Sequence, residues 1–227
     1  MTTKKHIPPV REPLTTEELE QLKSMDFVGL KLTDDEESRL REINKRGDHE
    51  RSERIVRVRA ELAPLLAELQ SAGLKIQSVS ELNSRSERYE QAIPILLRHL
   101  QMPYSDIVKS AIARSLAVPK PEIRKAWPTL VEEYRKAPRG WGIKAPGDTR
   151  EYRLTAKDDL AHTLAVTVTD ETLEELIELA RDRAQGGSRV LLLRALRKSK
   201  NPLAKQAVDE LANDPQLAKE IASWRTR

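Results

Sequence analysis

A short phrase that occurs twice constrains the fold of this chain more than any other feature. Residues 92–100 (AIPILLRHL) return as residues 126–134 (AWPTLVEEY), at an offset of 34 (128 minus 94). The alanine, the proline and three large apolar positions recur in register. A fixed period of roughly 20 to 50 residues is typical of stacked structural repeats. We therefore expect helix pairs from residue 89 onward.

The composition agrees with an all-α fold. The 227 residues include only 8 glycines, and aromatic residues make up 4% of the chain. These are too few for the turns and β-forming side chains of an all-β protein. Cys is absent, which excludes disulfides, thiolate metal sites and cysteine nucleophiles and fits a reducing compartment. We see neither a signal peptide nor a membrane-spanning apolar run, and expect a cytoplasmic protein.

The pattern predicts three regions. Residues 1–13 are polar and proline-rich and should form a flexible tail. Residues 14–88 should be an N-terminal helical region packed on the first repeat. It opens with two capping boxes, Thr15 to Glu18 and Thr33 to Glu36, which predict helices over 17–23 and from 34 toward Asn44. The apolar stretch 27–30 between them should dock on the domain. Residues 89–227 should be the repeat domain.

A longer helix is expected between His49 and Gln70. Its apolar residues are spaced 3, 4, 3, 4 along one stripe, and they are Ile55, Val58, Leu62, Leu65 and Leu69. This stripe either packs against the first repeat, which we favour, or forms a dimerisation seam. We expect Gly47 to end the preceding helix, Pro64 to kink this one or start another, and Gly73 to end it.

The repeat region should contain three helix pairs. Their predicted ranges are 90–100 with 105–117, 122–135 with 155–166, and 172–183 with 188–198. Two further helices should start at Pro202 and Pro215, each after a capping residue. A 16-residue insertion, 136–151, interrupts the second pair and holds three of the eight glycines. A loop of that length is typically functional or disordered.

The second helices of the pairs also correspond. Residues 113–117 (ARSLA) match 161–165 (AHTLA) and, in part, 193–196 (LRAL). With the proline in the first helix, Asp106 at the start of the second and Arg114 within it, the region resembles HEAT repeats of the armadillo-like α-solenoid proteins. The resemblance covers residues 89–212 and fades in the third pair. It implies a short right-handed α-solenoid that serves as a binding scaffold, without implying a substrate.

No catalytic constellation is readable from the sequence. The four histidines lack a metal-binding spacing, and no phosphate-cradling glycine motif or nucleophile elbow occurs. We expect polar packing for His162 and helix capping for Asp158 and Asp159. The resemblance to HEAT repeats implies a structural ion pair for Arg114; the alternative is that Arg114 and Arg194 line the concave face formed by the second helices. A non-enzymatic chain without cofactor or metal is therefore expected.

Charge suggests where a partner binds. Residues 89–227 carry 24 Lys/Arg and 19 Asp/Glu, a net of +5, and the excess lies in segments 135–157 and 189–205. We expect either a solvated basic surface or an anionic partner. The glycine-rich insertion combines a tryptophan with cations, which suits protein interfaces and nucleic-acid stacking alike. The residues proposed to bind a partner are Arg139, Trp141, Lys144, Arg150, Arg153, Arg194 and Arg197.

Two functions compete. The first is a protein-interaction scaffold whose partner presents an acidic protein surface, with Trp141 as the apolar anchor. The alternative is a HEAT-like protein that binds nucleic acid through segments 135–157 and 189–205. DNA glycosylases built on HEAT-like repeats are a precedent, but the aspartate and tryptophans of their active site cannot be assigned here. We favour a protein partner because the net charge of +4 is modest.

Overall fold

The computed structural model describes residues 11–22, 30–84 and 89–224. In these ranges the chain forms twelve α-helices, two short 3₁₀ helices and one two-stranded β-ribbon, which confirms the predicted all-α class. The chain divides into two compact units, Met1–Ile55 and Val56–Arg227. The division expected from the sequence, into residues 1–13, 14–88 and 89–227, stays a prediction.

The first unit holds α1 (Thr16–Gln21) and the first part of α2 (Asp34–Ser71). Both predicted capping boxes are confirmed. Thr15 accepts a bond from the Glu18 amide, and Glu36 Oε2 accepts a 2.7 Å bond from the Thr33 amide. Arg11 donates twice to the buried Glu36 carboxylate. The first ten residues of the predicted tail, and residues 27–29 of the apolar stretch, lie outside the described residues.

The second helix is longer than predicted. It runs unbroken through Gly47, and Pro64 does not end it either, so a single 38-residue helix replaces the two we expected. Gly47 does not adopt the left-handed conformation of a helix-ending glycine. Glycine within a helix costs only about 1 kcal/mol, which flanking helix formers can offset. The helix ends at Ser71, and Gly73 follows with a positive φ of 90°, as predicted.

The apolar stripe of α2 is only partly buried. Leu65 and Leu69 are fully buried in the core of the second unit, and Val58 and Leu62 pack against it. Ile55, which we counted in the stripe, is 48% exposed. The C-terminal half of α2 therefore packs on the helices that follow it, as we favoured, while the N-terminal end of the stripe does not.

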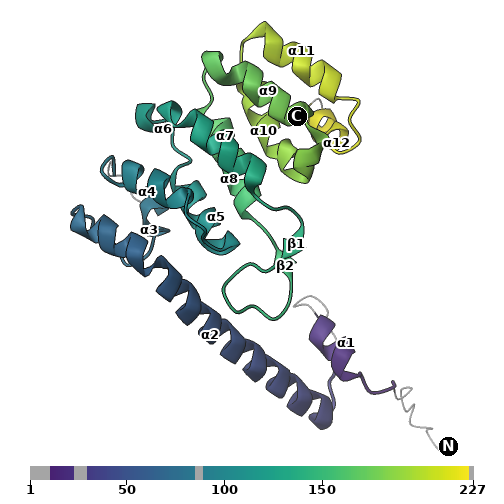
Figure 1. The fold of residues 1–227 in the computed structure, drawn as a ribbon. Helices are drawn as coiled ribbons and strands as arrows, with labels where there is room; N and C mark the ends of the chain where they lie inside the picture. Colours follow the sequence, from purple (N-terminus) through teal and green to yellow (C-terminus); the bar gives the residue numbers. More distant parts are fainter. Residues whose placement is uncertain (1–10, 23–29, 85–88, 225–227) are drawn as a thin grey trace, which may run out of the picture. The chain divides into compact units, whose positions relative to one another are not determined.

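The second unit continues with a short helix, α3, and then nine helices in chain order (Figure 1). Their bounds are α3 (Glu81–Ser84), α4 (Ala92–Leu100), α5 (Asp106–Ser115), α6 (Pro121–Lys125), α7 (Trp127–Lys136), α8 (Ala156–Thr167), α9 (Leu173–Arg181), α10 (Arg189–Lys198), α11 (Pro202–Leu211) and α12 (Ala218–Ser223). The 3₁₀ helices η1 (Asp170–Thr172) and η2 (Arg183–Ser188) precede α9 and α10.

Consecutive helices pack in pairs. Helix α4 contacts α5, α7 contacts α8, and α9 contacts α10. The second helices also contact one another, because α8 packs against α5 and also against α10. The first helix of the second pair is divided at Ala126 into α6 and α7, so the predicted single helix over 122–135 is wrong. The two repeat prolines, Pro94 and Pro128, therefore both lie in the first turn of a helix, where the missing N–H is tolerated.

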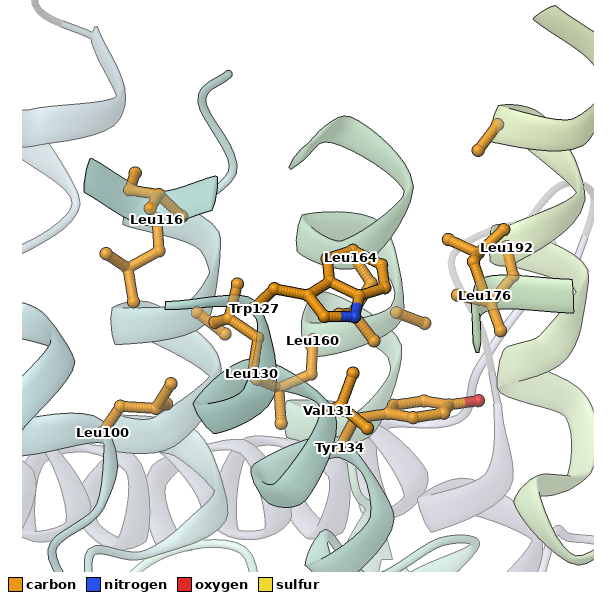
Figure 2. Close-up of a cluster of buried hydrophobic side chains, with 14 of the residues drawn as sticks. Leu100, Leu116, Trp127, Leu130, Val131, Tyr134, Leu160, Leu164, Leu176 and Leu192 are labelled. Carbon is orange, nitrogen blue, oxygen red and sulfur yellow. The ribbon is translucent and has the colours of Figure 1, made fainter. Parts of the chain in front are cut away.

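One continuous apolar core runs through the pairs. Figure 2 shows Trp127 and Leu130 of α7 beside Leu160 and Leu164 of α8, with Leu116 on one side of them. The buried leucine and isoleucine positions of this core include Leu96, Leu100, Ile112, Leu116, Leu130, Leu160, Leu164, Leu192 and Leu196. Leu97 is half-buried against the same core. None of the described helices is both long and apolar enough to cross a membrane.

Candidate functional site

The insertion between α7 and α8 forms a β-hairpin. Strands β1 (Trp141–Gly142) and β2 (Tyr152–Arg153) pair antiparallel, with Trp141 opposite Arg153 and Gly142 opposite Tyr152. The amide of Leu154 extends the ladder by donating to the Gly140 carbonyl at 2.9 Å. Gly140 has a φ of 82°, a conformation that favours glycine and lets the chain turn from α7 into the strand.

The loop of this hairpin, residues 143–151, is anchored on neighbouring helices. The Lys144 carbonyl accepts a 3.0 Å bond from the Ile107 amide at the start of α5. The Pro146 carbonyl accepts a 2.6 Å bond from Arg57 of α2. Between them Ala145 is buried, and its amide donates to Asp148 at 2.8 Å. Hydrogen bonds at both sides of a buried residue give the loop a defined conformation.

Two large apolar side chains project from the hairpin into solvent. Trp141 is 68% exposed and Ile143 is 57% exposed. Their spacing of two residues is the one that places side chains on the same face of an extended strand. The exposure of Trp141 agrees with its predicted role as an anchor. We did not predict Ile143, although its place next to Gly142 and Lys144 in a polar loop was the signal that could have identified it.

The cations predicted in the insertion take three different settings. Arg139 and Arg153 are exposed at the base of the hairpin, where Arg139 donates to the Ala184 carbonyl at 2.9 Å and Arg153 to Asp158 at 3.3 Å. Arg150 donates to the Tyr152 hydroxyl at 2.8 Å and lies over its ring. Lys144 is half-buried. The ladder places Arg153 directly opposite Trp141, whereas Arg139 reaches toward Ala184 and Gly186.

The remaining two predicted residues lie on α10. Arg197 is exposed and its guanidinium lies 5.3 Å from the centre of the Trp224 ring. Arg194 is also exposed. Burial, followed by the positive charge of Arg194, lowers the pKa of His162 on the neighbouring helix α8. His162 is half-buried there, in line with the expected polar packing role.

Part of the basic charge that we assigned to the surface is internal. Lys157 is buried and donates to the carbonyls of Tyr134 and Ala137, where it caps the C-terminal end of α7. Arg189 is 0% exposed and donates to the Ala180 and Gly186 carbonyls and to Asp214. Both residues bind the chain's own acceptors, so each basic segment presents one cation fewer to a partner than its sequence suggests.

The acidic residues of this region hold the helices together. Arg114 pairs with Asp159 at 3.1 Å, which confirms the structural ion pair. The expected capping by Asp158 and Asp159 is wrong, because α8 is capped from another helix. Asp106 at the start of α5 accepts bonds from the amides of Thr155 and Ala156, both at 2.9 Å. Glu61 of α2 in turn accepts from the Ser105 amide and hydroxyl at 2.6 Å.

Within the described ranges, no group of three or more His, Asp or Glu side chains could hold a metal ion. The strongest candidate for a functional site is therefore the hairpin surface, defined here as Arg139, Trp141, Ile143 and Arg153. Comparisons of the chain with protein-family models, with curated proteins and with solved structures found no match. A function for this chain has to follow from its own residues.

Proposed function

We propose that this chain is a non-enzymatic helical-repeat scaffold that binds an acidic segment of another protein through the hairpin surface. The observation that carries the proposal is the exposure of Trp141 and Ile143, two residues apart in the sequence, on an anchored β-hairpin. Tryptophan is enriched among the residues that dominate the binding energy of protein interfaces. Single exposed apolar residues are common on protein surfaces, but neighbouring ones of this size suggest a contact site.

The hairpin is suited to binding because it is ordered before a partner arrives. The ladder fixes the strand that bears Trp141, and the bonds of Lys144 and Pro146 fix the loop beyond Ile143. Association costs free energy when loops and side chains must be ordered on contact. A preorganised hairpin avoids much of that cost, so two apolar side chains can contribute a larger share of their burial to affinity.

The charge beside the two apolar residues favours an acidic partner. Arg153 lies opposite Trp141 in the ladder, and exposed Arg139 precedes the same strand. The pair between Arg153 and Asp158 is a single contact of 3.3 Å at an exposed position. Exposed cations of this kind speed up the encounter with an acidic surface and select against basic ones. Nucleic acid would use the same tryptophan for stacking. The internal positions of Lys157 and Arg189 reduce the exposed basic surface that a nucleic-acid backbone could contact, and favour the protein partner.

The proposed scaffold is a HEAT-like solenoid. Three features support it: the 34-residue sequence period, the pairing of α4 with α5, α7 with α8 and α9 with α10, and the contacts that link α5, α8 and α10 in a row. In such a stack an insertion within one repeat can grow without disturbing the core. The hairpin is that insertion.

The test is quantitative affinity capture from cell extract by four forms of the protein. These are the wild type, Trp141→Ala, Ile143→Ala and, as a matched control, Leu203→Ala, which removes an exposed leucine (42%) from α11. We expect the two hairpin variants to lose the same protein partner and the control to retain it, with thermal melts showing that all four are folded. Equal capture of the partner by all four forms would show that the hairpin is not the binding site. If the partner lost by the hairpin variants is nucleic acid, and its binding to the wild type weakens steeply as the salt concentration rises, the alternative function is correct.

A further inference from the structure

A cationic pocket lies at the base of the hairpin. It shares Arg139 and Arg153 with the hairpin surface but is not lined by Trp141 or Ile143. Its volume is about 250 Å³, and it is lined by segments from four parts of the second unit: 138–140, 153–154, 157–158 and 185–188. Three cations, Arg139, Arg153 and Lys157, line it together with one acid, Asp158. The lining therefore carries a net charge of +2 (three minus one).

The position of Arg139 in this pocket is fixed. Its Nη1 donates to the Ala184 carbonyl at 2.9 Å, and a Cβ added to Gly186 would lie 3.3 Å from its Cδ and Nη1. Gly186 has a φ of 68°, so the close approach of the guanidinium depends on a glycine with this conformation. A guanidinium has five N–H donors, and the bond to Ala184 uses one of them.

Lys157 adds positive charge to the pocket. Its ammonium group donates to the carbonyls of Tyr134 in α7 and of Ala137 just after it, not to a carboxylate. Burial lowers the pKa of Lys157, the nearby charge of Arg139 lowers it further, and Asp182 opposes this shift. Two cations thus face one small cavity and repel each other, which an anion between them would relieve.

The pocket also contains a buried acceptor that lacks a donor. Gln185 lines the pocket and is only 7% exposed. Its Nε2 donates to Asp182 at 2.6 Å, which fixes the orientation of the amide because the carboxylate can only accept. No donor from the described residues reaches the buried Oε1. A ligand that suits the pocket therefore combines negative charge with an O–H group.

We propose that this pocket binds a dianionic phosphate group that brings a hydroxyl, either hydrogen phosphate itself or a small hydroxylated phosphate monoester. Arg139 and Arg153 bind the phosphate oxygens, since the guanidinium fork matches phosphate geometry. Lys157 adds positive potential, and Gln185 Oε1 accepts from the ligand hydroxyl. Ligand pockets commonly span about 300–1,000 Å³, so this smaller one suits a ligand of a few heavy atoms beyond the phosphate.

The experiment is a titration of the full chain by ¹H–¹⁵N NMR with inorganic phosphate, glycerol phosphate, ethyl phosphate, sulfate and acetate at equal ionic strength. We expect phosphate and glycerol phosphate to shift the amides of residues 185–188. Sulfate and ethyl phosphate, which keep the charge but have no free O–H as dianions, should bind about tenfold more weakly, and acetate weaker still. Equal affinity for phosphate and glycerol phosphate identifies free phosphate as sufficient, and tighter binding of the ester identifies a monoester ligand.

Substitutions of residues inside and outside the pocket test whether phosphate binds there. Arg139→Ala should weaken phosphate binding about tenfold or more, while Arg150→Ala, which removes a hairpin cation that does not line the pocket, should leave it unchanged. Gln185→Leu should abolish the preference for phosphate over sulfate. Arg153→Ala repeats the first test if Arg139→Ala does not fold.

Trp141→Ala should bind phosphate like the wild type, so failure of the protein-binding proposal leaves this result intact. Absence of shifts at 185–188, or no preference for phosphate over sulfate in the wild type, would overturn the assignment.

Discussion

Asp106 Oδ1 accepts a 2.9 Å hydrogen bond from the backbone N–H of Ala156, 50 residues further along the chain. The other carboxylate oxygen accepts from the Thr155 amide at 2.9 Å. The first residue of α5 thus satisfies two amides at the start of α8, which would otherwise lack partners inside the helix. Because the hairpin leads directly into α8, this contact also fixes where the hairpin leaves the helical core.

Replacing this carboxylate should destabilise the second unit. For Asp106→Ala we expect a loss of roughly 1–3 kcal/mol in the free energy of unfolding, because one buried and one part-buried amide lose their acceptor. Urea titration followed by circular dichroism measures it. The matched control is Asp209→Ala on the exposed face of α11, which should change the value by less than about 0.5 kcal/mol. Equal effects of the two substitutions would contradict the capping role.

Core leucines of two different pairs should be similarly costly to truncate. Leu116 and Leu164 are both 0% exposed, so Leu116→Ala and Leu164→Ala should each cost about 2–5 kcal/mol. Leu203→Ala, at an exposed position of α11, should have little effect. Denaturant titration of the three variants gives the comparison. A loss below about 1 kcal/mol for either core variant would place that leucine outside the core.

The buried guanidinium of Arg189 should be needed for folding rather than for binding. It donates to the backbone carbonyls of Ala180 in α9 and Gly186 in η2, and to the side chains of Asp214 and Gln216 between α11 and α12. Arg189→Ala leaves these acceptors buried without their donor and should cost about 3–5 kcal/mol. Arg194→Ala, an exposed arginine of the same helix, should change stability by less than about 0.5 kcal/mol. Similar stability of Arg189→Ala and Arg194→Ala would contradict this role and indicate that Arg189 belongs to the exposed basic surface.

The first unit should lose stability in acid through Glu36. Hydrogen bonds from the Thr33 and Leu14 amides, and then the Arg11 guanidinium, lower the pKa of this carboxyl from 4.5 to about 2. A folded-state pKa below the ordinary value means that this contribution is complete above about pH 4.5 and is lost as the pH falls toward 2. The protection of the Leu14 amide against hydrogen exchange, relative to its intrinsic exchange rate at each pH, should therefore fall in that window. In Glu36→Gln this protection should lack the pH dependence, and an unchanged profile in the variant would refute the assignment.

Local signals in the sequence predicted local structure well. The two capping boxes were correct because each depends on residues only three positions apart. The repeat phrase located α4 and α7, and the spacing of apolar residues identified the buried face of the C-terminal half of α2. The same rules failed at Gly47, where a residue that commonly ends helices lies inside one. Neighbouring residues there favour the helix by more than one glycine opposes it.

What the sequence could not show depends on distant partners. Lys157 reads as one more surface cation, because its acceptors on Tyr134 and Ala137 lie 23 and 20 residues away. Arg189 finds Asp214 at a separation of 25 residues. In the candidate site, the composition of the insertion pointed to Trp141, but its pairing with Arg153 and the anchoring of the loop on α2 and α5 arise only in the fold.

The most direct test of the central claim is photo-crosslinking from the hairpin itself. A photoreactive phenylalanine analogue replaces Trp141 in one form of the protein and Leu203 in the control form, and adducts formed in cell extract are identified by mass spectrometry. If the hairpin surface binds an acidic protein segment, the probe at position 141 should yield one dominant protein adduct that maps to an acidic stretch, and the probe at 203 should not. No specific adduct at position 141, or the same adducts at both positions, would contradict the claim.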